Sequence, residues 1–109
     1  MVVSNISRFE IWLVDLNPTK SKEINKTRPC IIISPNEMSA LSTVLVAPMT
    51  SKGFDFPCRV ECGFKGKKGL ILLDQIRAVD KTRLIKKLGT LDVDTQVKLC
   101  ATLQEMFVF

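Results

Sequence analysis

The chain has 109 residues, and its 16 lysines and arginines outnumber its 11 acidic residues, which gives a net charge of +5. This length predicts a single domain over residues 1–109 with a modest core, and an apolar fraction of 46% excludes a disordered chain. The sequence contains no histidine, so any catalysis must proceed without the commonest acid–base residue. The positive charge favours an anionic partner, either nucleic acid or an acidic protein, although an ordinary basic surface is the simpler alternative.

The spacing of the cysteines and the hydropathy of the chain indicate the cellular compartment in which we expect the protein. The four cysteines are Cys30, Cys58, Cys62 and Cys100. They show no Cys-x-x-Cys pair, and without histidine they predict no metal site, so we interpret them as reduced and mostly buried residues of a cytoplasmic protein. No apolar run is long enough to span a bilayer, and the N-terminus lacks the features of a secretion signal. We therefore expect no membrane association.

The first strand is predicted over residues 8–16, which are rich in aromatic and β-branched side chains and end at a turn signal, Asn17-Pro18. A polar loop continues to Lys26. Three consecutive isoleucines then predict a strand over residues 31–34 that is buried on both faces, because flanking prolines and β-branched side chains disfavour a helix. Arg28 stands at the mouth of this strand.

The middle of the chain alternates between short strands and turns. Residues 37–42 are ambiguous and predict one helical turn at most, and residues 43–48 predict a third strand. Residues 49–53 are small and polar, which is typical of a turn. Residues 56–62 alternate apolar and charged side chains, so one face of that segment should be exposed to solvent. Glycines and lysines over residues 63–69 predict a basic hairpin turn.

The last part of the chain changes from strand to helix. Residues 70–73 predict a buried strand, and residues 81–87 predict a short turn and a last strand that ends at Gly89. Asp92 is a plausible N-cap for a C-terminal amphipathic helix. Its apolar stripe is Val93, Val97, Cys100, Leu103 and Phe107. Several short strands followed by one helix predict a mainly β fold, a small curled barrel with the helix docked on it or on a partner chain.

Polar residues collect at the ends of three predicted apolar strands, where a rigid scaffold can present chemistry. They are Glu23, Arg28, Thr50, Ser51, Asp74, Gln75 and Arg77. Arg28 is a permanent cation whose planar donor fork suits a phosphate, and Thr50 carries a hydroxyl that can donate to a phosphoryl oxygen. Glu23 is a candidate general base.

Lysines near these positions could follow a phosphate backbone. They are Lys52, Lys65, Lys67 and Lys68. Each candidate also has a structural alternative. Arg28 could pair with a nearby carboxylate, and the Thr50 side chain could cap its own turn. Asp74 and Arg77 could form a surface ion pair. The sequence alone does not show that these residues converge in space.

Four segments of this chain, in order and spacing, resemble the MazF/PemK family of toxin endoribonucleases. They are RFEIWLVDLNP (8–18), KTRP (26–29), VAPMTS (46–51), and LDQIR (73–77) followed by Asp80, Lys81, Arg83 and Leu84. The resemblance implies an SH3-like barrel with a C-terminal helix, usually a homodimer. It also implies metal-independent, cofactor-free cleavage of single-stranded RNA such as mRNA by attack of the 2′-OH, which leaves 2′,3′-cyclic phosphate and 5′-OH ends. A cognate antitoxin with an acidic, disordered tail would neutralise it.

The same resemblance implies roles for individual residues. Arg28 and Thr50 correspond to the catalytic pair of the family, and Glu23 corresponds to an acidic residue that assists in some members. Asp74, Gln75 and Arg77 correspond to a block beside the RNA groove. We also expect Ser51 and Lys52, which follow Thr50, to contact RNA.

The sequence departs from the family pattern at one position, and it leaves two alternative functions to consider. Family members usually begin with Arg-Gly-Asp, whereas this chain has Arg8-Phe9-Glu10, so Phe9 replaces a glycine that tolerates unusual dihedral angles. The same barrel serves in CcdB-like toxins that bind DNA gyrase without cutting RNA, but these lack the arginine–threonine pair. A degenerate member that only binds RNA or its antitoxin is the third possibility.

Overall fold

The structure is a computed structural model that describes residues 6–17, 27–53 and 56–108. Within these residues the strands and the helix are β1 (Glu10–Asp15), β2 (Thr27–Ile32), β3 (Thr43–Thr50), β4 (Arg59–Phe64), β5 (Lys67–Leu72), β6 (Arg77–Asp80), β7 (Leu84–Thr90) and α1 (Val93–Phe107). Three short 3₁₀ turns lie between them, η1 (Asn36–Met38), η2 (Leu73–Gln75) and η3 (Lys81–Arg83).

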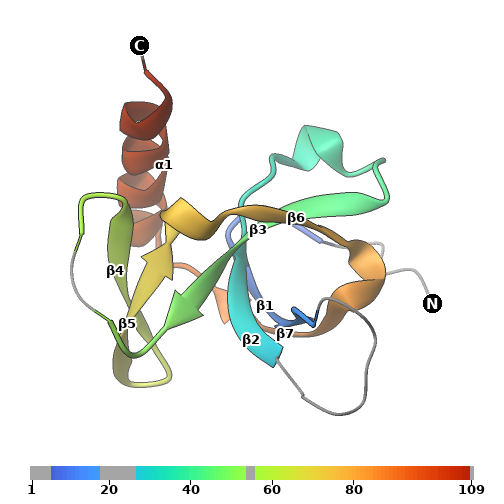
Figure 1. The fold of residues 1–109 in the computed structure, drawn as a ribbon, viewed down its shortest axis with the longest axis horizontal. Coiled ribbons are helices and arrows are strands. Elements are labelled where there is room, and N and C mark those ends of the chain that lie inside the picture. The colour runs from blue at the N-terminus through green and yellow to red at the C-terminus, as the bar shows by residue number, and fades with distance from the viewer. Residues whose placement is uncertain (1–5, 18–26, 54–55, 109) are drawn as a thin grey trace.

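The strands form one curled sheet in the order β4-β5-β3-β2-β1-β7, and β6 pairs with a separate part of β3. All the strand pairs are antiparallel. Figure 1 shows the sheet wrapped around on itself on one side, while the β4–β5 hairpin extends to the other side and α1 stands beside β4. The predicted mainly β barrel with a C-terminal helix is confirmed.

Strand β2 runs through the centre of the sheet and is buried on both faces, as its isoleucines predict. Cys30 and Ile32 belong to a core inside the curl, which also contains Trp12. Ile31 belongs to a second core, which also contains Leu99 of α1. The strand begins at Thr27, earlier than the predicted start at residue 31, so Arg28 lies within β2 and not in the loop before it.

Two other predictions on strands need correction. Strand β6 was not predicted, because its four residues become a strand only by pairing with the edge of β3. The predicted seven-residue hairpin turn is much tighter, since β4 ends at Phe64 and β5 begins at Lys67. Lys65 (φ 52°) and Gly66 (φ 75°) both have positive φ, which is the geometry of a two-residue turn between twisted strands.

Helix α1 starts as predicted, but only part of the predicted stripe, Cys100 and Leu103, packs on the core. The Asp92 carboxylate accepts a hydrogen bond from the Thr95 N–H at 2.8 Å, which confirms the N-cap. Thr95 and Leu99 are buried, whereas Val93 and Val97 of the predicted stripe are 70% and 64% exposed. The helix therefore has two apolar faces, and periodicity could not show which one packs on the sheet.

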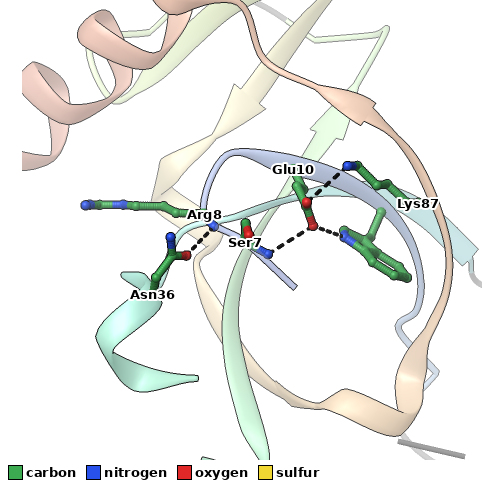
Figure 2. A network of polar contacts seen from close by, with 6 residues as sticks. Ser7, Arg8, Glu10, Asn36 and Lys87 are labelled. Atoms are coloured by element: carbon green, nitrogen blue, oxygen red, sulfur yellow. Dashed lines mark hydrogen bonds and ion pairs between the residues drawn. The ribbon is translucent and has the colours of Figure 1, made fainter. Parts of the chain in front are cut away.

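The beginning of β1 is held by a buried carboxylate (Figure 2). Glu10 Oε1 accepts hydrogen bonds from the Ser7 N–H at 3.0 Å and from the Trp12 indole N–H at 2.9 Å, and Oε2 lies 3.1 Å from Lys87 Nζ. Burial raises the pKa of Glu10, but these three partners outweigh it and hold the pKa below its usual range. The residue before it, Phe9, has φ 74°, so it keeps the left-handed conformation that a glycine would adopt without strain.

The structure also bears on the cysteines and on membrane association. All four cysteines are free; Cys30 and Cys62 are buried, and Cys58 and Cys100 are half-buried. Burial raises the pKa of Cys30 to about 12 and that of Cys62 to about 11, so both are inert thiols at neutral pH. Across the described ranges, no helix combines the length and the apolar character that a bilayer crossing requires.

Candidate functional site

Arg28 and Thr50 come from neighbouring strands. The β2–β3 pairing ends where Cys30 lies opposite Pro48, and Arg28 and Thr50 lie two residues beyond that point on their own strands. The two residues that the sequence singled out, 22 positions apart in the chain, both line one hollow.

A hollow of about 430 Å³ opens over this pair. It is lined by Arg28, Pro29, Met49, Thr50, Ser51, Lys52, Phe64, Lys65, Lys67, Lys68 and Gly69. The lining contains five cations and no acidic residue, so the hollow, named the cationic groove below, attracts anions. An exposed Arg28 and the lysines of the β4–β5 hairpin supply its charge.

The Thr50 hydroxyl already has one partner. Thr50 Oγ1 accepts a hydrogen bond from the Lys52 N–H at 3.1 Å, so the side chain does cap its own turn. A hydroxyl that accepts one hydrogen bond still has its proton to donate. The structural and functional interpretations of Thr50 are thus compatible, and the turn fixes the orientation in which the hydroxyl would meet a ligand.

Gly69 allows β3 and β5 to approach each other at this point. A Cβ atom on Gly69 would lie 3.3 Å from the Thr50 carbonyl oxygen, closer than most side-chain carbons come to a backbone atom. Any other residue would push β5 away from the end of β3 or shift the Thr50 carbonyl. Gly69 therefore allows β5 to lie close to the end of β3 beside Thr50, where both strands border the cationic groove.

The Asp-Gln-x-Arg block lies apart from the cationic groove. Asp74, Gln75 and Arg77 are exposed, and none of them lines that hollow. Asp74 does not pair with Arg77, because its carboxylate binds Arg59 through the Nε–Oδ1 and Nη2–Oδ2 contacts of 3.3 and 3.4 Å. The Arg59 hydrogen bonds lower the pKa of Asp74. Arg77 lies opposite Val46 of β3, four residues before Thr50.

Neither a general base nor a metal site emerges from the described residues. Glu23, the candidate base, lies outside them. Within residues 6–17, 27–53 and 56–108 no group of three cysteine, aspartate or glutamate side chains is arranged to hold a metal ion. Arg28 is a poor proton acceptor at neutral pH, because its pKa exceeds about 12.

Sequence reasoning missed two residues beside the predicted pair. Phe64 contributes an aromatic ring to the cationic groove, with Lys65 Nζ 5.5 Å from the ring centroid. Glu61 lines a second hollow of about 200 Å³ that shares Thr50 with the cationic groove. The alternation of β4 predicted that Glu61 faces solvent, but only the pairing of β4, β5 and β3 shows that it shares a face of the sheet with Thr50, across Leu70.

Comparison with known proteins identifies relatives over nearly the whole chain. A family model described as PemK-like, MazF-like toxin of type II toxin–antitoxin system matches residues 7–107. The Endoribonuclease MazF of Staphylococcus epidermidis is 35% identical, over 86% of this chain and 84% of the relative.

Solved structures share the fold at lower sequence identity. A mycobacterial endoribonuclease in complex with its cognate antitoxin has a TM-score of 0.80 at 20% identity, over 96% of this chain and 99% of that one. MazF from Deinococcus radiodurans has a TM-score of 0.72 at 22% identity, over 97% of this chain and 96% of that one.

Proposed function

The chain belongs to the PemK-like, MazF-like family of type II toxin–antitoxin toxins, and we propose that it cuts single-stranded RNA, including mRNA, by using the substrate's own 2′-hydroxyl as the nucleophile. As a family member it is a toxin endoribonuclease. The observation that carries the proposed chemistry is that Arg28 and Thr50 both line one cationic groove. This pair can bind a phosphate and stabilise charge on it without histidine or metal.

The groove suits a single strand better than a duplex. Its cations can follow the phosphate backbone, and Phe64 offers a ring on which an unpaired base can stack. Ser51 and Lys52 follow Thr50 in the chain and line the same groove, and we propose that they contact the same strand. Bases that are already unstacked reach such a ring at little energetic cost, whereas duplex bases are paired.

The reaction proceeds by displacement at phosphorus. The 2′-oxygen attacks the adjacent phosphorus, the bond from phosphorus to the 5′-oxygen breaks, and the products are a 2′,3′-cyclic phosphate and a 5′-hydroxyl. Negative charge grows on the non-bridging oxygens, where the Arg28 guanidinium and the Thr50 hydroxyl donate hydrogen bonds. Holding the 2′-oxygen in line with the leaving oxygen supplies much of the remaining acceleration.

Two protons must move in this reaction. The 2′-hydroxyl loses one, for which we propose Glu23 as the base, and the leaving 5′-oxygen gains one. Arg28 keeps its proton throughout and acts as a charge stabiliser. Asp74, Gln75 and Arg77 are proposed to contact RNA beyond the groove, with the Asp74 carboxylate engaged by Arg59 at the same time.

A homodimer is the proposed assembly, and the second apolar face of α1 supports it. Val93, Val97 and Phe107 are 70%, 64% and 75% exposed, which is an unusual concentration of apolar side chains on one short helix. We expect the mass of a dimer in analytical ultracentrifugation, and a monomer for Val97→Glu. Lys98→Glu, a charge change on the polar side of the same helix, is the control and should stay dimeric.

An antitoxin with an acidic, disordered tail is the proposed partner, because carboxylates would compete with phosphates for the cationic groove. One of the structural neighbours was solved with its own antitoxin. The four free thiols suit the reducing cytoplasm, where mRNA is found, and we propose that location for the toxin.

A single atom of the substrate tests the proposed nucleophile. An RNA that is cut by the protein should resist cleavage when the nucleotide on the 5′ side of the cut carries 2′-hydrogen, while its affinity changes little. Cleavage of this 2′-deoxy substrate at the same bond would exclude the 2′-hydroxyl as the nucleophile.

A further inference from the structure

A second hollow of about 200 Å³ adjoins the cationic groove at Thr50 and differs from it in chemistry. It is lined by Thr50, Ser51, Gly53, Glu61, Lys68, Gly69 and Leu70. Several residues line both hollows, so a strand of RNA held over Arg28 and Thr50 passes directly beside the second one. Its volume suits one base rather than a whole nucleotide.

The floor and the far wall of this hollow follow from strand pairing. Leu70 of β5 lies opposite Thr50 of β3 on one side and opposite Glu61 of β4 on the other. Paired residues share a face of the sheet, so Thr50 and Glu61 stand on the same face about 10 Å apart, two strand spacings. Half-buried Leu70 lies between them as an apolar floor.

The second hollow carries one carboxylate, Glu61, and one cation, Lys68, so it lacks the excess of positive charge with which the cationic groove attracts a phosphate. Glu61 is exposed and has no hydrogen bond or ion pair with another residue in the part of the chain that the structure describes. A carboxylate repels RNA phosphates, and it repels the side chains of an acidic peptide equally. It accepts hydrogen bonds from N–H groups, which the edges of nucleobases present.

We propose that the second hollow binds the base next to the cut and that Glu61 selects a base carrying an amino group, an inference that rests on the proposed ribonuclease function. The base lies on Leu70, and the carboxylate accepts from N6 of adenine, N4 of cytosine, or N1 and N2 of guanine. Uracil meets it with carbonyl oxygens on both sides of its single N–H, so uracil is disfavoured at this position.

The test compares wild type with Glu61→Gln, because an amide both donates and accepts and no longer distinguishes amino from carbonyl edges. Cleaved ends of a random-sequence RNA pool are mapped for both proteins. Binding is measured separately with four short 2′-O-methyl RNA oligonucleotides, each made of a single kind of base, so that this assay needs no known cut. Glu37→Gln, which removes the same charge from an exposed position on η1, is the matched control.

We expect wild type and Glu37→Gln to disfavour uracil at one position by roughly 10- to 100-fold. Glu61→Gln should lose that preference at this position while other positions keep theirs. An unchanged sequence preference in Glu61→Gln would overturn the proposal, and so would a uniform loss of rate with the preference intact.

The binding assay separates the subsite from the chemistry. If the wild-type protein cuts no RNA, the proposed function fails, and the four non-cleavable oligonucleotides still show whether Glu61 discriminates between bases. Equal affinity of wild type for all four would overturn the subsite even if cleavage occurs.

Discussion

Charged side chains gather at two places in this protein, and the two places differ in whether the charges have partners. At the start of β1, Glu10 is only 8% exposed and is bound by Ser7, Trp12 and Lys87. In the cationic groove, Arg28 and the lysines form no ion pair with any described residue. A charge with three partners holds the fold together. Exposed charges of one sign repel one another, and they are relieved when an anion binds.

The largest effect we expect is on catalysis, from Arg28→Ala. The cleavage rate should fall by at least about 10³-fold, because the main donor to the phosphoryl oxygens is lost. The free energy of unfolding should change by less than about 0.5 kcal/mol, since Arg28 is exposed. Single-turnover cleavage and thermal unfolding measure the two quantities. A variant that is folded and cuts at the wild-type rate would remove Arg28 from the mechanism.

Thr50→Val should come next, with a fall of about 10²-fold in the cleavage rate from loss of one hydrogen-bond donor. Thr50→Ser keeps the hydroxyl and its bond from the Lys52 N–H, so it should retain most activity. The pair of variants separates the hydroxyl from the methyl group. Equal rates for Val and Ser would show that the hydroxyl takes no part in the chemistry.

Glu10→Gln should behave in the opposite way to Arg28→Ala. Replacing the carboxylate weakens three interactions at a buried position, and we expect a loss of about 2 kcal/mol in the free energy of unfolding. The cleavage rate per folded molecule should be unchanged. Urea denaturation gives the stability, and a large rate defect in fully folded Glu10→Gln would break the distinction between the two places.

Phe9 tests backbone strain beside this carboxylate. Phe9→Gly and Phe9→Ala both lose the ring, so their difference reports the cost of φ 74° for a residue with a Cβ atom. We expect the glycine variant to be more stable than the alanine variant by about 1 kcal/mol. If alanine proved equal or better in urea denaturation, the left-handed conformation at residue 9 would carry no strain.

The smallest effect concerns pH. The pKa of Glu10 is lowered in the folded state, so its contribution is fully present above the unfolded value, about 4.3, and is lost as the pH falls through the folded value. The stability difference between wild type and Glu10→Gln should therefore shrink on going from pH 7 to pH 3. A constant difference across that range would mean that the carboxylate is not stabilised by its partners.

Local features of the sequence predicted the fold well. Three isoleucines predicted the two-sided burial of β2, and Asp92 predicted the start of α1, because both signals lie within a few residues. Strand β6 was missed because it depends on the edge of β3, distant in sequence. The packing face of α1 was only partly right, because two apolar faces compete and periodicity does not rank them.

The candidate site depends more on long-range pairing. Arg28 and Thr50 could be selected by their chemistry, but their place in the lining of one hollow depends on the pairing of β2 with β3. Glu61 could not be selected, since an exposed glutamate on a strand is ordinary until the pairing of three strands places it on the same face as Thr50. The partner of Asp74 could not be predicted from the sequence either, because Arg59, at the beginning of β4, is 15 residues away in the chain.

Cleavage of a long single-stranded RNA by the purified protein in EDTA tests the central claim most directly. The account predicts discrete cuts that leave 2′,3′-cyclic phosphate and 5′-hydroxyl ends, with DNA of the same sequence left intact. No cleavage by a folded protein free of antitoxin would contradict this account and favour a toxin that acts by binding. Cleavage that occurs only when metal ions are present would contradict the metal-independent mechanism.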